Sequence, residues 1–546
     1  MFPRITKIKQ GNRQYRYLRL VENYRLHGKT KQRVIANLGN LDKVSDKIDN
    51  VIDALLKFSR KKRYSPEELS SKRVLHYGVV KLAKYLWGEL HLGEIIDKAL
   101  YRKRLKFKVS LPVLIMVINR LTEPKSKLSV TSWQEKIYLE DLKKKVPYHH
   151  FLRSLNYLVK VKREIELALF KRLINLFNME VNIIFYDITS SYFEGRACNI
   201  SRFGYSRDRR PDKKQILIGL VVTKQGLPIA HDVLEGNIAD KTTLKQTVDN
   251  LKKRFSLRRC IIVCDRGMVS EENLEYLEDA EFEYIIALRK RNSSKVRKII
   301  KLSSGEKSIK LNQDNWVKEV EYEGMRYLVC YNHEKAKDEK EFREEMINRI
   351  KIKLDRLTEQ VKAGRIKNNK LIIEKATEII TSQRGFKKYF SYQVKEGGFS
   401  YQLNQKQIDY ESLLDGIYIL RSNCKDLSIP QIVKAYKNLS QVEEAFKEIK
   451  DFLELRPIYH YQEDRVREHV MVCVLAYLME KILDNRLASA GVALSARRAI
   501  EALKDLMLVE NMLGENRILC VTELNKEQRE ILKAIGIGKI PRTIME

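Results

Sequence analysis

The sequence is poor in cysteine, tryptophan and long apolar runs. Seven cysteines are scattered along 546 residues, so they form neither a disulfide framework nor a paired Cys-x-x-Cys zinc pattern. The strongest apolar run, Val470 to Leu478, is far shorter than the roughly 20 residues of a membrane span. The start of the chain lacks the apolar segment of a signal peptide. We therefore expect a protein of the reducing cytoplasm that does not bind a membrane.

Acidic residues are too few to balance the basic ones. There are 71 Asp and Glu against 105 Lys and Arg, which gives a formal net charge of +34. The chain is nevertheless 44% hydrophobic, so it is not a disordered basic tail. A folded protein with this charge is expected to bind a polyanion, and nucleic acid is the first candidate.

The first 63 residues are the most basic part, with 17 Lys and Arg against 5 Asp and Glu. Two runs rich in β-forming residues, 15–24 and 33–38, flank His27-Gly28, which predicts a β-ribbon. A helix is expected at about 45–58. The ribbon and its tip are predicted to bind DNA through Lys29, Lys31 and Arg33; a merely solvated basic arm is the alternative.

The periodicity of apolar residues divides the rest of the chain. Helical spacing dominates 64–178, which we interpret as a helical DNA-binding or linking domain. Strand-like runs then alternate with helices, expected at about 241–255 and 271–279, which is typical of a mixed α/β sheet. Further along the chain, a hairpin is expected at 389–403 and a helix at 496–508. The predicted parts are a core at 179–288, an insertion at 289–425 that is β-rich with a charged helical segment, a second core part at 426–483, and a helical C-terminal region at 484–546 that is a candidate for dimerisation.

Two aspartates directly follow apolar strand runs. Asp187 comes after Ile183-Ile184-Phe185-Tyr186, and Asp265 comes after Ile261-Ile262-Val263-Cys264. We place each at the carboxyl end of its strand, where sites of α/β sheets lie. Two carboxylates close together repel each other unless a divalent cation neutralises them. For either aspartate alone, a strand-end cap is the simpler interpretation.

A third carboxylate is expected in the segment 436–450. In one continuous helix, Tyr436, Glu443 and Lys450 are seven residues apart and share a face, so Tyr436 and Lys450 would meet phosphates beside the metal. The rival interpretation is a capping box that starts a helix at Ser440, with Glu443 in a structural role. Glu444 is an equally acceptable carboxylate on chemistry alone.

These residues resemble the DDE transposases of bacterial insertion sequences, in the branch with a Tyr-(2)-Arg-(3)-Glu-(6)-Lys signature. Tyr436, Glu443 and Lys450 fit that spacing, whereas Leu439 stands at the arginine position. The resemblance runs with gaps from about 14 to 480. Other blocks similar to the family are 33–39, 185–190, 204–208, 236–240, 264–268 and 456–460.

The resemblance implies an RNase H-like (retroviral-integrase-like) α/β core with a mainly β insertion, and helical N- and C-terminal regions. It implies that Asp187, Asp265 and Glu443 bind two Mg²⁺ ions, for which Mn²⁺ can substitute. The 177 residues between Asp265 and Glu443 would hold the insertion. Hydrolysis would free the element's 3′ ends, which then attack target DNA. The implied partners are double-stranded DNA, as terminal inverted repeats and target, and a second copy of the chain in a bacterial or archaeal nucleoid.

Several further residues are weaker candidates for DNA contacts. Arg266 is expected to meet a phosphate or to form a salt bridge. Lys447 is a solvated neighbour of Lys450, and Arg209 and Arg210 lie in a basic loop that either touches DNA or is simply exposed. Trp316 is a candidate for stacking on an unpaired base, although packing on a strand is the simpler role. The final list of predicted DNA contacts is Tyr436, Lys450, Arg266, Lys447, Arg209, Arg210, Lys29, Lys31, Arg33 and Trp316.

Two other functions stay open at this point. An RNase H-like nuclease of repair or junction type would share the three carboxylates but lack an end-binding N-terminal domain. A non-catalytic DNA-binding protein derived from a transposase would be expected to have lost a carboxylate, and all three are present.

Overall fold

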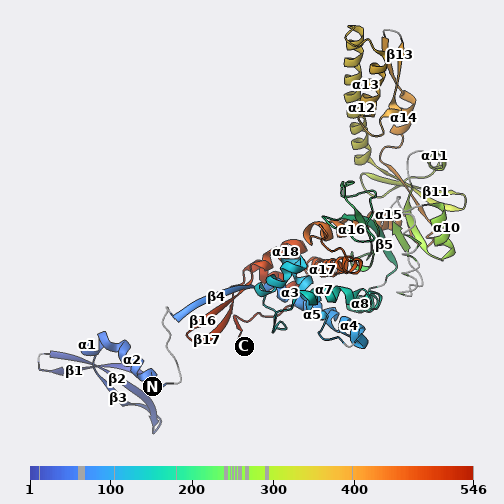
Figure 1. The fold of residues 1–546 in the computed structure, drawn as a ribbon. Helices are drawn as coiled ribbons and strands as arrows, with labels where there is room; N and C mark the ends of the chain where they lie inside the picture. The colour runs from blue at the N-terminus through green and yellow to red at the C-terminus, as the bar shows by residue number, and fades with distance from the viewer. Residues whose placement is uncertain are drawn as a thin grey trace. The chain divides into compact units, whose positions relative to one another are not determined.

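The computed structural model describes residues 1–544 except 12, 60–67, 104, 180, 239–243, 246–247, 249–250, 252–254, 256–260, 265–269, 289–293 and 396–397. The chain divides into two compact units (Figure 1). The first contains Met1–Leu75, Leu508–Thr522 and Pro541–Glu546, and the second contains His76–Met507 and Glu523–Ile540.

The predicted β-ribbon is present in the first unit. Strands β1 (Phe2–Gln10), β2 (Arg13–Leu26) and β3 (Lys29–Asn40) form an antiparallel sheet in that order. His27 and Gly28 both have positive φ, 48° and 74°, as a two-residue hairpin turn that matches strand twist requires. The helix expected at 45–58 is α2 (Ile48–Leu56), after the short helices α1 (Leu41–Val44) and η1 (Ser45–Lys47).

A second sheet of this unit joins segments from both ends of the chain. Its order is β18-β17-β16-β4, with β4 at Leu69–His76, β16 at Met507–Leu513, β17 at Asn516–Val521 and β18 at Thr543–Ile544. Glu510 on β16 pairs with Arg73 on β4 and with Arg517 on β17. The C-terminal region is therefore not wholly helical, and the helix expected to reach Leu508 ends at Lys504, because the following residues pair with β4.

Helices dominate the early part of the second unit, as predicted. They are α3 (Gly78–Glu89), α4 (Leu92–Leu100), η3 (Tyr101–Lys103), α5 (Ser110–Thr122), α6 (Lys127–Trp133), η4 (Gln134–Lys136), α7 (Tyr148–Leu158) and α8 (Lys162–Phe177). The long helix α17 (Glu463–Ser489) packs against α5, α7 and strand β7, and its run Val470 to Leu478 is buried. In the described part of the chain, no helix combines the length and apolar character needed to span a bilayer. Helices α18 (Ala496–Lys504) and α19 (Lys526–Ile535) pack on α17.

The segment predicted as the first core part folds as a mixed sheet. Strand β5 (Ile183–Tyr192) pairs antiparallel with β6 (Gln215–Thr223), which pairs antiparallel with β7 (Pro228–Glu235). On its other side β5 pairs parallel with β8 (Ile261–Cys264), and β8 pairs parallel with β9 (Glu283–Ala287). The order β7-β6-β5-β8-β9, with helix α10 (Glu271–Asp279) between the last two strands, is an RNase H-like core. The helix expected at 241–255 falls largely outside the described residues.

Part of the predicted insertion extends this sheet. Strands β15 (Ile417–Ser422), β12 (Met325–Asn332), β11 (Asn315–Tyr322) and β10 (Ile309–Lys310) continue it beyond β9, with helix α11 (Ser294–Ser303) packed on β11 and β12. The expected boundaries at 289 and 425 therefore cut through one hydrogen-bonded sheet. These boundaries were inferred from changes in the periodicity of apolar residues, whereas strand pairing joins segments that are distant in sequence.

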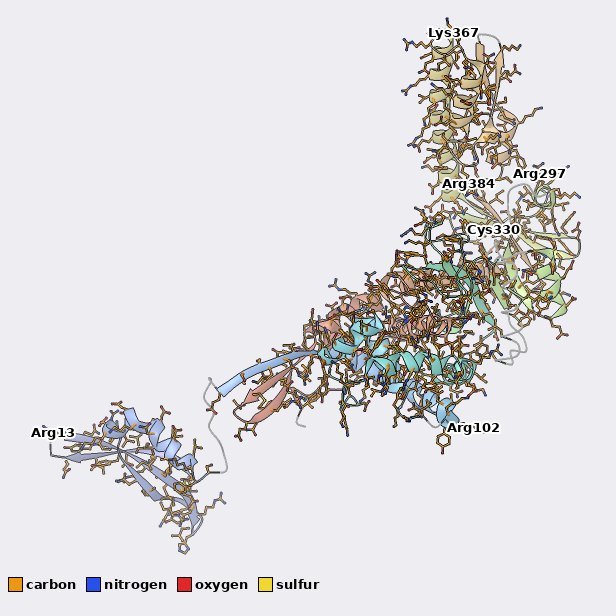
Figure 2. The ribbon with its side chains drawn as sticks, in the orientation of Figure 1. Arg13, Arg102, Arg297, Cys330, Lys367 and Arg384 are labelled. Atoms are coloured by element: carbon orange, nitrogen blue, oxygen red, sulfur yellow. The ribbon has the colours of Figure 1, made fainter. Side chains whose placement is uncertain are left out.

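The rest of the insertion has a core of its own. Helices α12 (His333–Lys362) and α13 (Asn369–Thr381) pack on the hairpin formed by β13 (Phe390–Lys395) and β14 (Gly398–Leu403) (Figures 1 and 2). The short helix η6 (Lys387–Tyr389) precedes the hairpin and contacts α14 (Gln405–Ser412), which follows it. The insertion thus contains more helix than the expected mainly β character. The charged helical segment predicted there is α12, and its apolar stripe forms the core with the hairpin; the buried members include Ile350, Leu354, Leu357, Val361, Ile372 and Phe399.

Candidate active site

Asp187 lies in the middle of β5, not at the strand's end as predicted. The strand continues to Tyr192 because Ile188 to Tyr192 keep pairing with β6, and Asp187 stands opposite Leu220. The described pairing between β5 and β8 ends with Tyr186 beside Cys264. Asp187 directly follows Tyr186 in the chain, and Asp265 directly follows Cys264. Asp265 and Arg266 lie outside the described residues.

The environment of Asp187 is fixed by close packing on β6. Tyr186 is 1% exposed, and its ring lies over Gly219, where any larger residue would collide with it. Asp187 itself is half-buried, whereas Phe185, Tyr186, Ile188 and Thr189 around it are buried. A rigid strand therefore holds this carboxylate beside the adjacent parallel strand.

The segment with the third carboxylate matches the rival interpretation in part: a new helix does begin at Ser440, but without the expected capping box. Helix α15 (Ile429–Lys437) ends before a new helix, α16 (Ser440–Lys447), which runs into a π-helical turn, η7 (Glu448–Phe452). Ser440 Oγ donates to Lys437 O, 3.1 Å away, so it does not form the expected capping box with Glu443. The single helix face expected for Tyr436, Glu443 and Lys450 is also absent, because a break and a π-turn interrupt the 3.6-residue period.

Helix α16 packs against β5 and β6, and Glu443 on it is exposed. Its neighbour Glu444 lies toward α17: burial raises the pKa of Tyr477 on that helix, and the Glu444 carboxylate adds to the rise. Sequence chemistry could not separate these two glutamates. Glu444 is exposed as well, so exposure does not distinguish the two glutamates in the structure.

Two of the other three signature positions, Tyr436 and Leu439, are half-buried and buried. The ring of Tyr436 stacks on Tyr418 of β15, with centroids 5.9 Å apart. Leu439 is 6% exposed and packs in the break between α15 and α16. The position that holds arginine in the signature is thus a core position here. Lys447, in contrast, is exposed, as expected of a solvated neighbour.

Lys450 lies in a buried ionic cluster. Its Nζ donates to Thr189 Oγ1 on β5 at 2.6 Å and to Asp208 Oδ1 at 2.8 Å, and Arg456 Nη1 lies 2.6 Å from the same Asp208 oxygen. Burial lowers the pKa of Lys450, while Asp208 opposes that shift. Lys450, which was expected to contact a phosphate, is thus bound by protein groups in the structure.

Sequence reasoning missed the functional potential of Asp208, Thr189 and Arg456. All three lie in blocks that resemble the family, at 204–208, 185–190 and 456–460, and that was the available signal. The loop before Asp208 is tied to β6 by backbone bonds between Arg202 and Gln215, at 2.9 and 3.0 Å. Gly204 permits this contact, because a Cβ there would stand 2.2 Å from Gly236 O.

The other predicted DNA-contacting residues differ in whether they form ion pairs within the protein. Arg210 forms a two-bond ion pair with Asp212, both bonds 2.9 Å, whereas Arg209 is exposed. On the ribbon, Arg33 pairs with Glu22 at 2.7 Å. Lys29 and Lys31 at the tip are exposed. Trp316 on β11 packs near Tyr331, with ring centroids 6.0 Å apart, as the simpler interpretation predicted.

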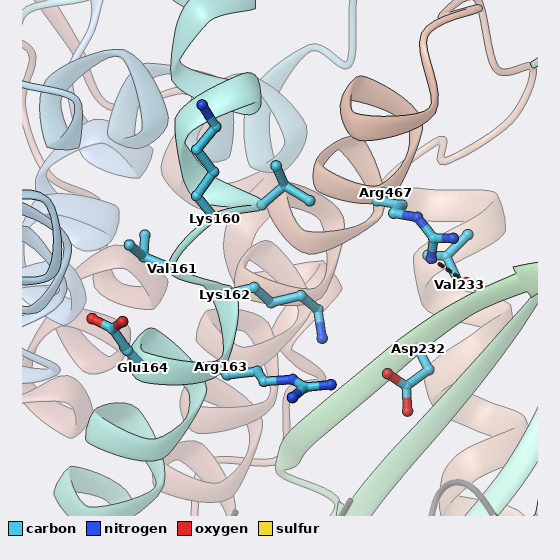
Figure 3. Close-up of a pocket in the computed structure, with 9 residues that line it drawn as sticks. Lys160, Val161, Lys162, Arg163, Glu164, Asp232, Val233 and Arg467 are labelled. Carbon is cyan, nitrogen blue, oxygen red and sulfur yellow. Dashed lines mark hydrogen bonds between the residues drawn. The ribbon is translucent and has the colours of Figure 1, made fainter. Parts of the chain in front are cut away.

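A polar pocket of about 360 Å³ lies elsewhere in the second unit, at the start of α8 beside β7 and α17 (Figure 3). Its basic residues are Lys160, Lys162, Arg163 and Arg467. Lys162 donates to Glu166 and to His231 O, at 2.7 and 2.6 Å, and Arg467 donates to Glu463 and to Val233 O. The protein's own acceptors therefore engage two of these four cations.

The donor chemistry of the predicted site fits a divalent cation, since Asp187 and Glu443 supply the oxygen ligands that Mg²⁺ prefers. Within the described ranges, no group of three His, Cys, Asp or Glu side chains is arranged to hold a metal. Asp265 lies outside these ranges, so this finding does not bear on the predicted triad.

The chain matches two protein families. Residues 183–479 match the transposase DDE domain, and residues 3–68 match the N-terminal domain of IS1634 family transposases. No curated protein matches the chain. Two transposase structures are similar: the piggyBac transposase synaptic complex with hairpin DNA (10% identity, 78% of this chain and 79% of that chain, TM-score 0.36) and the Mos1 transposase paired-end complex with the left transposon end (15%, 45% and 66%, 0.15).

A third is Marinitoga piezophila Argonaute in complex with 5′ OH guide RNA, at 9% identity, 59% of this chain and 70% of that chain, with a TM-score of 0.16. These scores are too low to carry an argument. The two family matches lie on different parts of the chain and agree, and the first spans more than half of it. The chain therefore belongs to the DDE transposases, with the N-terminal domain of the IS1634 insertion-sequence family.

Proposed function

We propose that Asp187, Asp265 and Glu443 are the metal-binding triad of this DNA transposase. DDE transposases catalyse metal-dependent cleavage and strand transfer of DNA. One observation carries the assignment of residues: β5 and β8 pair in parallel up to the residues directly before Asp187 and Asp265, and α16 with Glu443 packs on β5. The lateral distance between paired strands, about 4.8 Å, suits two carboxylates that share a cation.

The ion is proposed to be Mg²⁺, bound as a pair. When bound, two such ions activate the attacking oxygen and stabilise the leaving one. The chain's own part is to hold the carboxylates on a rigid strand and helix and to orient the DNA. Exposed Lys29 and Lys31 on the ribbon are proposed to contact terminal inverted repeats, and the basic loop with Arg209 to contact DNA near the site.

We further propose that the enzyme nicks the ends of its element, joins the 3′-hydroxyls to target DNA, and acts as a homodimer in the cytoplasm. Two copies are needed to hold two ends together in such a reaction.

The test replaces Glu443 by Gln, with Glu444→Gln as the matched control. Both variants lose one negative charge on α16, and both are expected to bind DNA in Ca²⁺. Plasmid cleavage in Mg²⁺ should fall only in Glu443→Gln, by more than the roughly 10- to 100-fold that outer-shell partners of a metal cost. Equal activity of the two variants would reject the role of Glu443.

A further inference from the structure

The buried carboxylate of Asp208 connects segments of the chain that resemble the family, because it binds Lys450 and Arg456. The side chain of Asp208 is 4% exposed, and its Oδ1 receives Lys450 Nζ at 2.8 Å and Arg456 Nη1 at 2.6 Å. Arg456 also binds Asp451 Oδ1 at 2.9 Å. Asp208 thus compensates two cations, of which Lys450 is 9% exposed and has no other described ion-pair partner.

The position of Lys450 connects the two described carboxylates of the predicted triad. Its second bond, 2.6 Å to Thr189 Oγ1, ends on β5 two residues beyond Asp187. Residues i and i+2 of a strand lie on one face, so Thr189 and Asp187 face the same side of the sheet. Lys450 itself belongs to η7, which directly continues the helix of Glu443.

Loss of the Asp208 charge would therefore affect the position of Glu443, which Asp208 does not itself contact in any described bond. Removing one partner of a buried ion pair leaves the other charge uncompensated, which is strongly destabilising. Lys450 would lose its charge or move out of the cluster. Either response weakens its hold on Thr189 and allows η7, and with it α16, to shift relative to β5.

We propose that Asp208 is a positioning residue that sets the spacing between Asp187 and Glu443 by fixing Lys450 against Thr189. This inference rests on the proposed function of those two carboxylates. In this account Lys450 holds η7 against β5 through its bond to Thr189.

The test compares Asp208→Asn with Asp415→Asn in the full-length protein. Asp415 offers the matched control: it forms a buried ion pair with Arg343, two bonds of 2.6 Å, at the base of the insertion and outside the predicted site. Both changes remove one carboxylate charge from a buried pair without changing its shape. Both should lower the melting temperature.

Only Asp208→Asn should alter the metal response. We expect the Mg²⁺ concentration for half-maximal plasmid cleavage to rise by about 10-fold or more, with DNA affinity in Ca²⁺ unchanged. Hydrogen exchange should become faster at 183–192 and 440–452 in this variant. In Asp415→Asn the faster exchange should be confined to segments around Arg343 and Asp415.

Two results would overturn the proposal. In one, Asp208→Asn keeps the metal response and the exchange pattern of the wild type. In the other, the two variants lose cleavage in proportion to their melting temperatures, which indicates a purely structural role. Failure of the triad itself is separate, because it would appear as normal cleavage by Asp187→Asn, a variant that leaves the Asp208 cluster intact.

Discussion

The ring of Tyr186 lies over Gly219 of the neighbouring strand, beside the predicted catalytic Asp187. A Cβ built on Gly219 would stand 2.8 Å from the Tyr186 hydroxyl oxygen and 3.0 Å from its Cε2 atom. Both residues belong to the buried centre of the sheet, where neither has room to move. The absence of a side chain at 219 is therefore a requirement for the geometry around Asp187.

Gly219→Ala is expected to destabilise the protein by about 1–3 kcal/mol, because overpacking a core forces side chains out of position. Cleavage should fall as well, since displacement of Tyr186 moves the adjacent Asp187. Chemical denaturation and plasmid cleavage measure the two effects. Gly88 on α3 is the control: a Cβ there meets nothing within 4 Å, so Gly88→Ala should stabilise the helix. A stable, active Gly219→Ala variant would contradict this packing.

Leu439 stands where the family signature has arginine, and we expect the signature residue to be harmful here. Leu439→Arg places a charge at a core position that is 6% exposed, with a cost of several kcal/mol unless the side chain reaches water. Leu439→Met, which keeps volume and polarity, should cost less than about 1.5 kcal/mol. The melting temperatures of both variants check this. Higher activity of Leu439→Arg at unchanged stability would show that the position faces DNA.

The ribbon tip should contribute electrostatically to DNA binding. Replacing Lys29 and Lys31 by Ala is expected to lower the slope of log K against log salt by about 0.9 for each lost phosphate contact. Arg33→Gln should change the slope less, because Glu22 already offsets the Arg33 charge at 2.7 Å. Fluorescence anisotropy with labelled duplex at several salt concentrations measures these slopes. Equal slopes for wild type and the double variant would remove the tip from the DNA interface.

A buried glutamate makes stability depend on pH. Burial raises the pKa of Glu468 on α17 to about 8, and among the described residues neither of its carboxyl oxygens has a hydrogen-bond partner. The folded state therefore keeps a proton that the unfolded state releases above its ordinary pKa of about 4.3. Stability from this group is complete below that value and is lost as pH rises to about 8, by at most about 1.4 kcal/mol per pH unit.

Glu468→Gln should flatten this dependence, because the amide has no proton to lose in this range. Melting temperatures between pH 5 and pH 8.5 would show a smaller decline in the variant than in the wild type, as set by the folded-state pKa of about 8. The same decline in both proteins would mean that Glu468 is ionised in the folded state.

Sequence patterns predicted the local elements well where period and turn residues agreed. The ribbon with His27-Gly28, the helix at Glu271–Asp279 and the hairpin at 389–403 are present. The family was also predicted from sequence, and the domain matches confirm it. These features depend on short-range interactions or on motifs that the chain shows directly.

Other features depend on contacts between segments that are distant in sequence. The extension of the sheet by β11, β12 and β15 rests on strand pairing, which periodicity does not reveal. The π-turn after α16 displaces Lys450 from the expected face, and only the fold brings Asp208 and Arg456 to it. The apolar run of β5 stops at Tyr186, although the strand itself continues to Tyr192. The sequence pattern therefore predicts Asp187 at the end of the strand, whereas it lies in the middle.

The central claim is that Asp187 is a metal-binding carboxylate of a DDE transposase, and one measurement tests it most directly. Purified Asp187→Asn protein is incubated in Mg²⁺ with supercoiled plasmid that carries the DNA flanking its gene, alongside DNA-binding assays in Ca²⁺. The account predicts that cleavage is lost while DNA affinity stays close to that of the wild type. Cleavage at the wild-type rate in the variant would contradict it.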